Sequence, residues 1–109
     1  MEEDNNLINK KEEFHILTSE ENKIFSIMPR FTIMLILLHD KKAKIKDLTI
    51  TLNLTPGNLD HHIRALEEIG LITKRAQIIS KKIYNAVEIT KLGKESFEKY
   101  LLSLKNIIR

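Results

Sequence analysis

The feature that most constrains the fold is a short turn between two segments whose apolar residues recur at helical spacing. The turn is Leu54-Thr55-Pro56-Gly57-Asn58. Thr55 suits the N-cap of a helix, and Pro56 suits the first helical position, where a missing N–H costs nothing. The apolar residues of the following helix recur at i, i+4 and i+7, and they are Leu59, Ile63 and Leu66. The sequence therefore predicts a new helix immediately after the turn, ending at Gly70.

The segments before this turn also show helical patterns. Leu48 and Leu52, at i and i+4, predict a short helix over residues 47–53. A strongly apolar stretch, residues 29–40, begins with proline and predicts a buried helix. The motif Thr18-Ser19-Glu20-Glu21 has the form of a capping box and predicts that another short helix starts there. Two short helices joined by a tight turn thus follow a longer buried one.

After Gly70 the apolar pattern changes from helical to alternating. Residues 71–78 are β-prone, and residues 79–82 are polar enough to turn. Residues 83–89 alternate, which places three apolar side chains on one face: Ile83, Val87 and Ile89. From Thr90, as N-cap, apolar residues return at a spacing of three and four to the end of the chain. The predicted fold class is mainly α with a small β-hairpin that has a basic tip.

Composition limits the kind of protein that this chain can be. Its 109 residues fit one domain, and 42% are hydrophobic, which is typical of a globular chain rather than a disordered one. The absence of cysteine excludes disulfides and thiolate metal sites and indicates a reducing, cytoplasmic setting. The longest apolar run, residues 33–38, is too short to cross a membrane. The acidic N-terminus argues against a signal peptide.

Charge is unevenly distributed along the chain. Residues 1–21 carry seven acidic and two basic side chains, whereas residues 41–82 carry nine basic and four acidic ones. A basic middle segment suits a polyanionic partner, although a lysine-rich solvated surface would have the same composition.

Three stretches carry a resemblance to a known family. They read LNLTPGNLDHHI at residues 52–63, LEEIGLI at residues 66–72 and VEITKLG at residues 87–93. Over residues 29–100 the chain resembles winged helix-turn-helix transcription regulators of the MarR/ArsR-like kind, especially small archaeal and bacterial single-domain forms. The resemblance implies a winged-helix fold that binds double-stranded DNA, with a recognition helix in the major groove and a wing on the phosphate backbone.

Two departures from the family pattern bear on DNA recognition. Asp60 stands where serine is commoner, which places an acid on the DNA-facing helix. Lys81 and Lys82 stand where arginines are commoner, so the wing is expected to contact phosphates rather than bases.

The helical wheel of the second short helix separates a core side from an outward side. At about 100° per residue, Gly57, His61 and Arg64 lie opposite Leu59, with Asn58 and Asp60 on the flanks. Asparagine pairs with adenine, arginine with guanine, and aspartate accepts from cytosine N4, while glycine lets the backbone approach a phosphate. The predicted DNA-binding residues are Thr55, Gly57, Asn58, Asp60, His61, Arg64, Lys74, Arg75, Lys81 and Lys82.

Other interpretations of these residues remain open. The polar face is also compatible with a solvated surface, and winged helices also serve as protein–protein interaction modules that do not bind DNA. His61 and His62 are adjacent, so on a helix they point about 100° apart and form a poor zinc pair. The sequence holds no catalytic motif. We therefore expect no enzyme activity, no cofactor and no metal, and no small-molecule effector is specified.

The final helix predicts how the chain assembles. We expect residues 1–20 to form an arm or an extra helix, residues 21–90 the DNA-binding domain, and residues 91–109 a dimerisation helix. An apolar stripe so near the end of the chain would be exposed in a monomer, which favours a homodimer. Phe14, Ile16 and Leu17 offer an alternative cover from within the chain. The predicted dimer interface consists of Phe97, Tyr100, Leu101, Leu104, Ile107 and Ile108.

Overall fold

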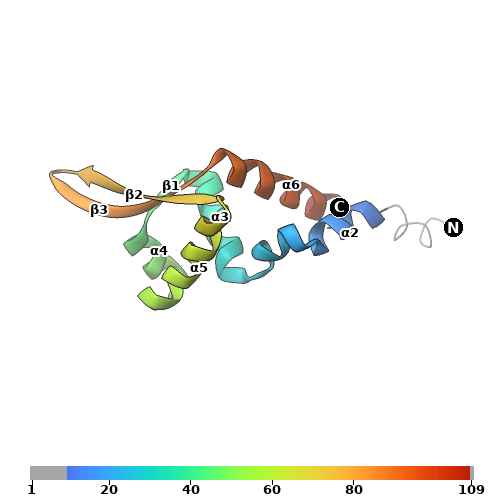
Figure 1. Cartoon of the computed structure of the whole chain (residues 1–109), viewed down its shortest axis with the longest axis horizontal. Helices are drawn as coiled ribbons and strands as arrows, with labels where there is room; N and C mark the ends of the chain where they lie inside the picture. Colours follow the sequence, from blue (N-terminus) through green and yellow to red (C-terminus); the bar gives the residue numbers. More distant parts are fainter. Residues whose placement is uncertain (1–9, 109) are drawn as a thin grey trace.

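The computed structural model describes residues 10–108, and within them the expected mainly helical fold with a small sheet is confirmed (Figure 1). Part of the predicted N-terminal arm, residues 1–9, lies outside the described residues. The elements, in chain order, are α2 (Lys11–Thr18), the 3-10 helix η1 (Glu20–Ser26), α3 (Met28–Asp40), β1 (Lys42–Lys44), α4 (Ile45–Leu52), α5 (Pro56–Glu68), β2 (Ile72–Ile79), β3 (Lys82–Ile89) and α6 (Lys91–Ile108).

The core lies between α3, α5, the base of the sheet and the first turns of α6. It is continued by an aromatic cluster that joins η1, α3 and α6. In this cluster the Phe25 and Phe97 rings meet edge to face with centroids 5.1 Å apart, and Phe31 lies 5.4 Å from Phe97. Phe97 is completely buried within the single chain, so it is not available to a second copy. We therefore remove it from the predicted dimer interface.

The helix-turn-helix has the local geometry that its sequence predicts. Asn53 ends α4 in the left-handed conformation, with φ of 52°. Thr55 is the N-cap of α5, and its side-chain oxygen accepts a hydrogen bond from the Asn58 N–H at 3.2 Å. Pro56 occupies the first turn. Because the turn is this short, the orientation of α5 is set by the packing of α4, whose Leu48 is buried in the core.

The capping box predicted at residues 18–21 does not form. Thr18 instead ends α2, and its hydroxyl donates to the Phe14 carbonyl at 2.9 Å. Ser19, which precedes η1, makes no side-chain cap.

The hairpin β2–β3 projects from the core as a long wing, with strand order β1-β3-β2 and antiparallel pairing throughout (Figure 1). Ile79 pairs with Lys82, which leaves Ser80 and Lys81 as a two-residue turn. Both have positive φ, of 50° and 67°. Positive φ at both central residues is typical of a type I′ turn, whose twist matches that of the strands.

The start of helix α6 is held in place by hydrogen bonds of Thr90 and by a close contact between Gly93 and the backbone of Leu71. Thr90 caps it, because its Oγ1 accepts from the Gly93 N–H at 2.9 Å and donates to the Gly70 carbonyl at 2.6 Å. A Cβ added at Gly93 would lie 2.0 Å from the Leu71 carbonyl oxygen. This contact brings α6 directly against the start of β2.

Beyond its first turns, α6 leaves the domain and runs beside α2 (Figure 1). The molecule is therefore elongated, with extents of 64 × 25 × 23 Å. The N-terminal segment thus packs on α6 within the same chain. This is the alternative to a dimer, in which α2 covers part of the apolar stripe of α6. No helix among residues 10–108 has the length and hydropathy of a membrane span.

Candidate nucleic-acid interface

Helix α5 presents one polar face outward and one apolar face inward. Leu59, Ile63 and Leu66 have no exposed surface. On the other side four predicted residues are exposed, and they are Gly57, Asn58, His61 and Arg64. The structure therefore brings the predicted outward residues together on a single surface of a helix that is rigidly seated in the core.

Asp60 connects this surface to the wing. One carboxylate oxygen lies 2.8 Å from Arg64 Nε, and the other lies 3.3 Å from Lys74 Nζ on β2. Both oxygens are thus already engaged, so Asp60 holds two of the cations predicted to contact DNA. Its expected role as an acceptor for cytosine would require both pairs to open.

The two basic residues of β2 point in opposite directions. Consecutive side chains of a strand alternate between its faces. Lys74 lies on the face toward α5, where it meets Asp60. Arg75 lies on the other face, with its Nε 3.2 Å from a carboxylate oxygen of Glu88. The Arg75 side chain is therefore directed away from that of Lys74, although the residue also lines a small groove with Asp60 and Lys74.

The wing tip combines charge with exposed apolar surface. Lys81 and Lys82 are exposed, as predicted. Ile78 and Ile83 face each other across the two strands and are 75% and 74% exposed. The sequence predicted that Ile83 shares one face with Val87 and Ile89, and the strand register keeps it there. Ile83 is exposed while Val87 is buried, because the hairpin extends beyond the reach of the core.

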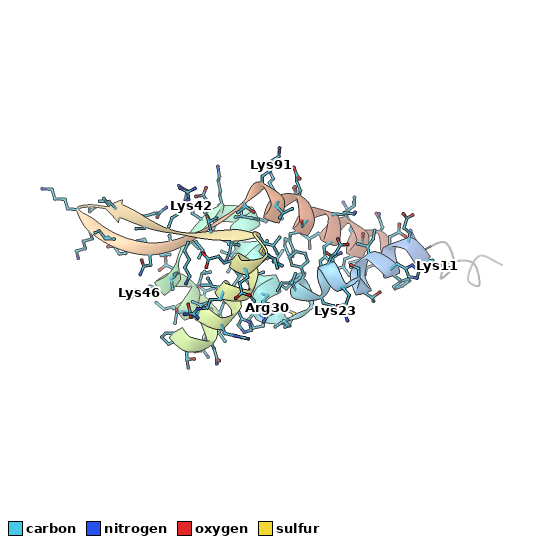
Figure 2. The ribbon with its side chains drawn as sticks, viewed as in Figure 1. Lys11, Lys23, Arg30, Lys42, Lys46 and Lys91 are labelled. Atoms are coloured by element: carbon cyan, nitrogen blue, oxygen red, sulfur yellow. The ribbon has the colours of Figure 1, made fainter. Side chains whose placement is uncertain are left out.

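The sequence alone did not single out Lys44, Lys46 and Tyr84, which lie between α4 and the wing. A groove of about 560 Å³ lies there, and the Lys44 ammonium sits 4.1 Å above the centre of the Tyr84 ring. Lys46 lies on the same side of the molecule as α4 and α5 (Figure 2). The only sequence signal for these lysines was the basic character of residues 41–82. A second, smaller groove of about 360 Å³ is lined by Asp60 of α5 together with Lys74 and Arg75 of the wing.

The two histidines of α5 have different environments. His61 is exposed, whereas Nδ1 of His62 accepts a hydrogen bond from Arg30 Nε on α3 at 3.1 Å. Partial burial lowers the pKa of His62, and the positive charges of Arg30 and of His61 lower it further. The neutral form of His62 is thus favoured, and its hydrogen bond from Arg30 joins α5 to α3. Within residues 10–108, no three potential ligands among His, Cys, Asp and Glu gather as a metal site would need.

Comparison with known proteins gives consistent results. A family model described as a winged helix DNA-binding domain matches residues 29–108. An uncharacterized protein of Methanocaldococcus jannaschii is 32% identical over 82 residues, which make up 75% of this chain and 89% of that protein.

Among solved structures, a transcriptional regulator homologue from Pyrococcus horikoshii OT3 superposes with a TM-score of 0.77 at 40% identity. The match covers 89% of this chain and 94% of that one. The heme sensor PefR from Streptococcus agalactiae has a TM-score of 0.68 at 20% identity, covering 93% of this chain and 70% of its own. At that identity the likeness concerns the fold alone.

Proposed function

This chain belongs to the winged-helix DNA-binding family of transcription regulators, and we propose that it binds double-stranded DNA as a homodimer through α5 and the β2–β3 wing. The observation that carries the proposal is the exposed polar face of α5. Asn58, His61 and Arg64 lie there together, while the opposite face of the helix is locked in the core. A helix held in this way suits insertion into the major groove.

Base readout would come from the exposed face of α5. The Asn58 amide matches adenine, and the Arg64 guanidinium matches guanine. Arg64 must first leave Asp60, but its side chain is 69% exposed, and an ion pair of this kind contributes at most about 1 kcal/mol. A guanine contact, which contributes about 1–3 kcal/mol, can therefore replace it.

The wing and α4 would supply the sequence-independent part of the affinity. Lys81 and Lys82 at the tip are placed to neutralise phosphates, as is Lys74 once it is released from Asp60. Lys46 of α4 lies on the same side and joins this set. Lys44 pairs with Ala86, which pairs with Arg75, so Lys44 shares the strand face of Arg75. Arg75 faces away and does not belong to this set.

The homodimer is supported by apolar surface on the projecting helices. Leu102 is 57% exposed and Ile108 is 73% exposed on α6, and Phe14 is partly exposed on α2. Leu104 and Ile107, which neighbour Ile108 on the helix, remain partly exposed. Exposed apolar patches of this kind usually mark an interface. A two-fold pair would present two α5 helices to half-sites about 34 Å apart, one turn of DNA.

The proposal is tested by selecting bound sequences from a random duplex pool and then measuring affinity for the selected site. Replacing both Asn58 and Arg64 by alanine should weaken binding at least tenfold, by about 1–3 kcal/mol per lost base contact. The matched control, Lys105→Ala with Asn106→Ala on the last turns of α6, also loses one cation and one amide and should bind normally. An intact chain that binds no duplex at low salt would overturn the proposal.

A further inference from the structure

A second basic surface lies on the opposite face of the sheet from α5. It is a groove of about 610 Å³ bounded by the end of α3, the base of β2 and β3, and the first turn of α6. Leu37, Leu38 and Ile89 form its apolar floor. Figure 2 shows Lys91, one of its residues, on the edge of the molecule away from α4 and α5. The groove is therefore separate from the proposed DNA-binding surface.

The rim of this groove carries a large excess of positive charge. Its cations are Lys41, Arg75, Lys91 and Lys94, and its single carboxylate belongs to Glu88. Glu88 pairs with Arg75 at 3.2 Å. In the part of the chain that the structure describes, no carboxylate lies within 4.0 Å of the ammonium groups of the three lysines. Three cations thus converge on one small groove without internal compensation.

The fold itself does not account for these lysines. Lys41 ends α3 with φ of 70° and ψ of −42°, a backbone conformation in which glycine would be less strained. Lys91 and Lys94 lie in the first turn of α6, which holds no acidic residue. Cations are disfavoured at that end of a helix because the helix dipole repels them. Lys91 and Lys94 therefore carry a local electrostatic cost that a ligand of opposite charge would offset, whereas the cost at Lys41 is one of backbone strain.

We propose that this groove binds a small organic polyphosphate, with its phosphates on the rim cations and its organic part on the apolar floor. The volume lies in the range of small-molecule sites, which are commonly apolar with a few convergent polar groups. Arg75 and the lysines are the side chains suited to phosphate oxygens. The inference goes beyond the proposed function, because it does not require that the chain bind DNA.

The test uses the full chain and ATP as the probe, with binding measured by isothermal titration calorimetry at physiological salt. Saturable one-site binding is expected, and ATP should bind more tightly than tripolyphosphate because only ATP has an organic part for the floor. Lys91→Gln with Lys94→Gln should weaken ATP binding about tenfold or more, since each lysine donates a charge-assisted hydrogen bond. The control, Lys99→Gln with Lys105→Gln, removes the same charge from later turns of α6 and should bind as the unmodified chain does.

A further variant separates a binding role from a structural one. Lys41→Gly should leave the melting temperature equal or higher, because it relieves the positive φ, and should still weaken ATP binding. The proposal fails if ATP does not saturate, if tripolyphosphate binds as tightly, or if the control loses as much affinity. It also fails if the Lys91/Lys94 variant loses DNA affinity that the Lys99/Lys105 control keeps, because the groove would then belong to the DNA surface. Failure of the intact chain to bind DNA would overturn only the proposed function.

Discussion

At the scale of single residues, two glycines of this chain differ sharply in what surrounds them. A Cβ at Gly93 would collide with the Leu71 backbone, 2.0 Å from its carbonyl oxygen, whereas a Cβ at Gly57 would meet nothing within 4 Å. Both residues lie in helices, where alanine is intrinsically favoured. Glycine is thus required by the fold at one position and not at the other.

The first prediction follows from this contrast and concerns stability. Gly93→Ala should lower the free energy of unfolding by more than about 2 kcal/mol, because α6 must move away from β2. Gly57→Ala should leave it unchanged or raise it by up to about 1 kcal/mol. Urea unfolding followed by circular dichroism measures both values. Equal effects at the two sites would contradict the packing described for Gly93.

The second prediction concerns Gly57 and DNA. If the start of α5 approaches a phosphate closely, a methyl group on Gly57 will stand in the way even though the free protein tolerates it. Gly57→Ala should therefore weaken binding to the selected site while stability is maintained. A gel-shift titration of the folded variant checks this, and unchanged affinity would show that the backbone of α5 stays away from the phosphates.

The third prediction concerns His62 and pH. The pKa of His62 is lowered from its ordinary value of 6.5, so the unfolded chain takes up a proton at this residue before the folded one does. The stability that neutral His62 contributes is fully present above about pH 6.5 and is lost as the pH falls through its folded pKa. Protonation would replace the hydrogen bond from Arg30 by repulsion. Urea unfolding between pH 8 and pH 5 should show a smaller loss for His62→Gln than for the unmodified chain; parallel curves would rule out this contribution.

At the scale of elements, we expect the wing to act through the charge at its tip. The fourth prediction is that Lys81→Ala with Lys82→Ala weakens binding to all duplexes alike and lowers the slope of log affinity against log salt by about 2. The melting temperature should not change, because both side chains are exposed. Affinity measured at several salt concentrations on specific and random duplexes gives the slope. A loss confined to one sequence would mean that these lysines read bases.

The elements that the sequence predicted well are those set by local chemistry. Thr55 caps α5 and Pro56 occupies its first turn, and both roles depend only on neighbouring residues. The spacing of Leu59 and Ile63 determines which face of the helix is buried. The capping motif near Thr18 was misleading because the hydroxyl of this residue bonds back to α2 instead. A local motif does not show which of two neighbouring helices will use it.

The parts of the candidate site that the sequence could not predict depend on tertiary geometry. Asp60 and Lys74 are 14 residues apart, and only the packing of α5 on the sheet brings them together. Alternation places Ile83 on the same face as Val87 and Ile89, but a strand pattern does not show where the core beneath that face ends. Arg75 was grouped with Lys74 because both are basic, although they occupy opposite faces of one strand.

At the scale of the whole molecule, we expect the long projection formed by α2 and α6 to form the dimer interface. The fifth prediction is that the intact chain is a dimer at micromolar concentration and that Leu102→Asp with Ile108→Asp is a folded monomer. Both side chains are largely exposed, so the change removes the interface and spares the core. Leu101 is a poorer choice for substitution because it packs against the core.

Light scattering gives the mass of each form, and Leu92→Asp is the matched control on the first turn of α6. Leu92 is 52% exposed but lies outside the predicted interface, so this variant should remain a dimer. A monomeric intact chain would contradict the homodimer and, with it, the expectation of a palindromic site.

The strand order β1-β3-β2 has one more consequence, which concerns aggregation. β2 is an edge strand along its whole length, and the outer half of β3 is also an edge because β1 covers only the positions from Ala86 to Glu88. Open edges are templates for pairing with another chain, and charged side chains are a common protection against it. In β2 the segment Ala76-Gln77-Ile78-Ile79 is uncharged and β-prone, and its neighbours Lys74 and Arg75 on one side and Lys81 and Lys82 on the other act as gatekeepers. A wing stripped of all its basic residues would therefore be prone to fibril-like association.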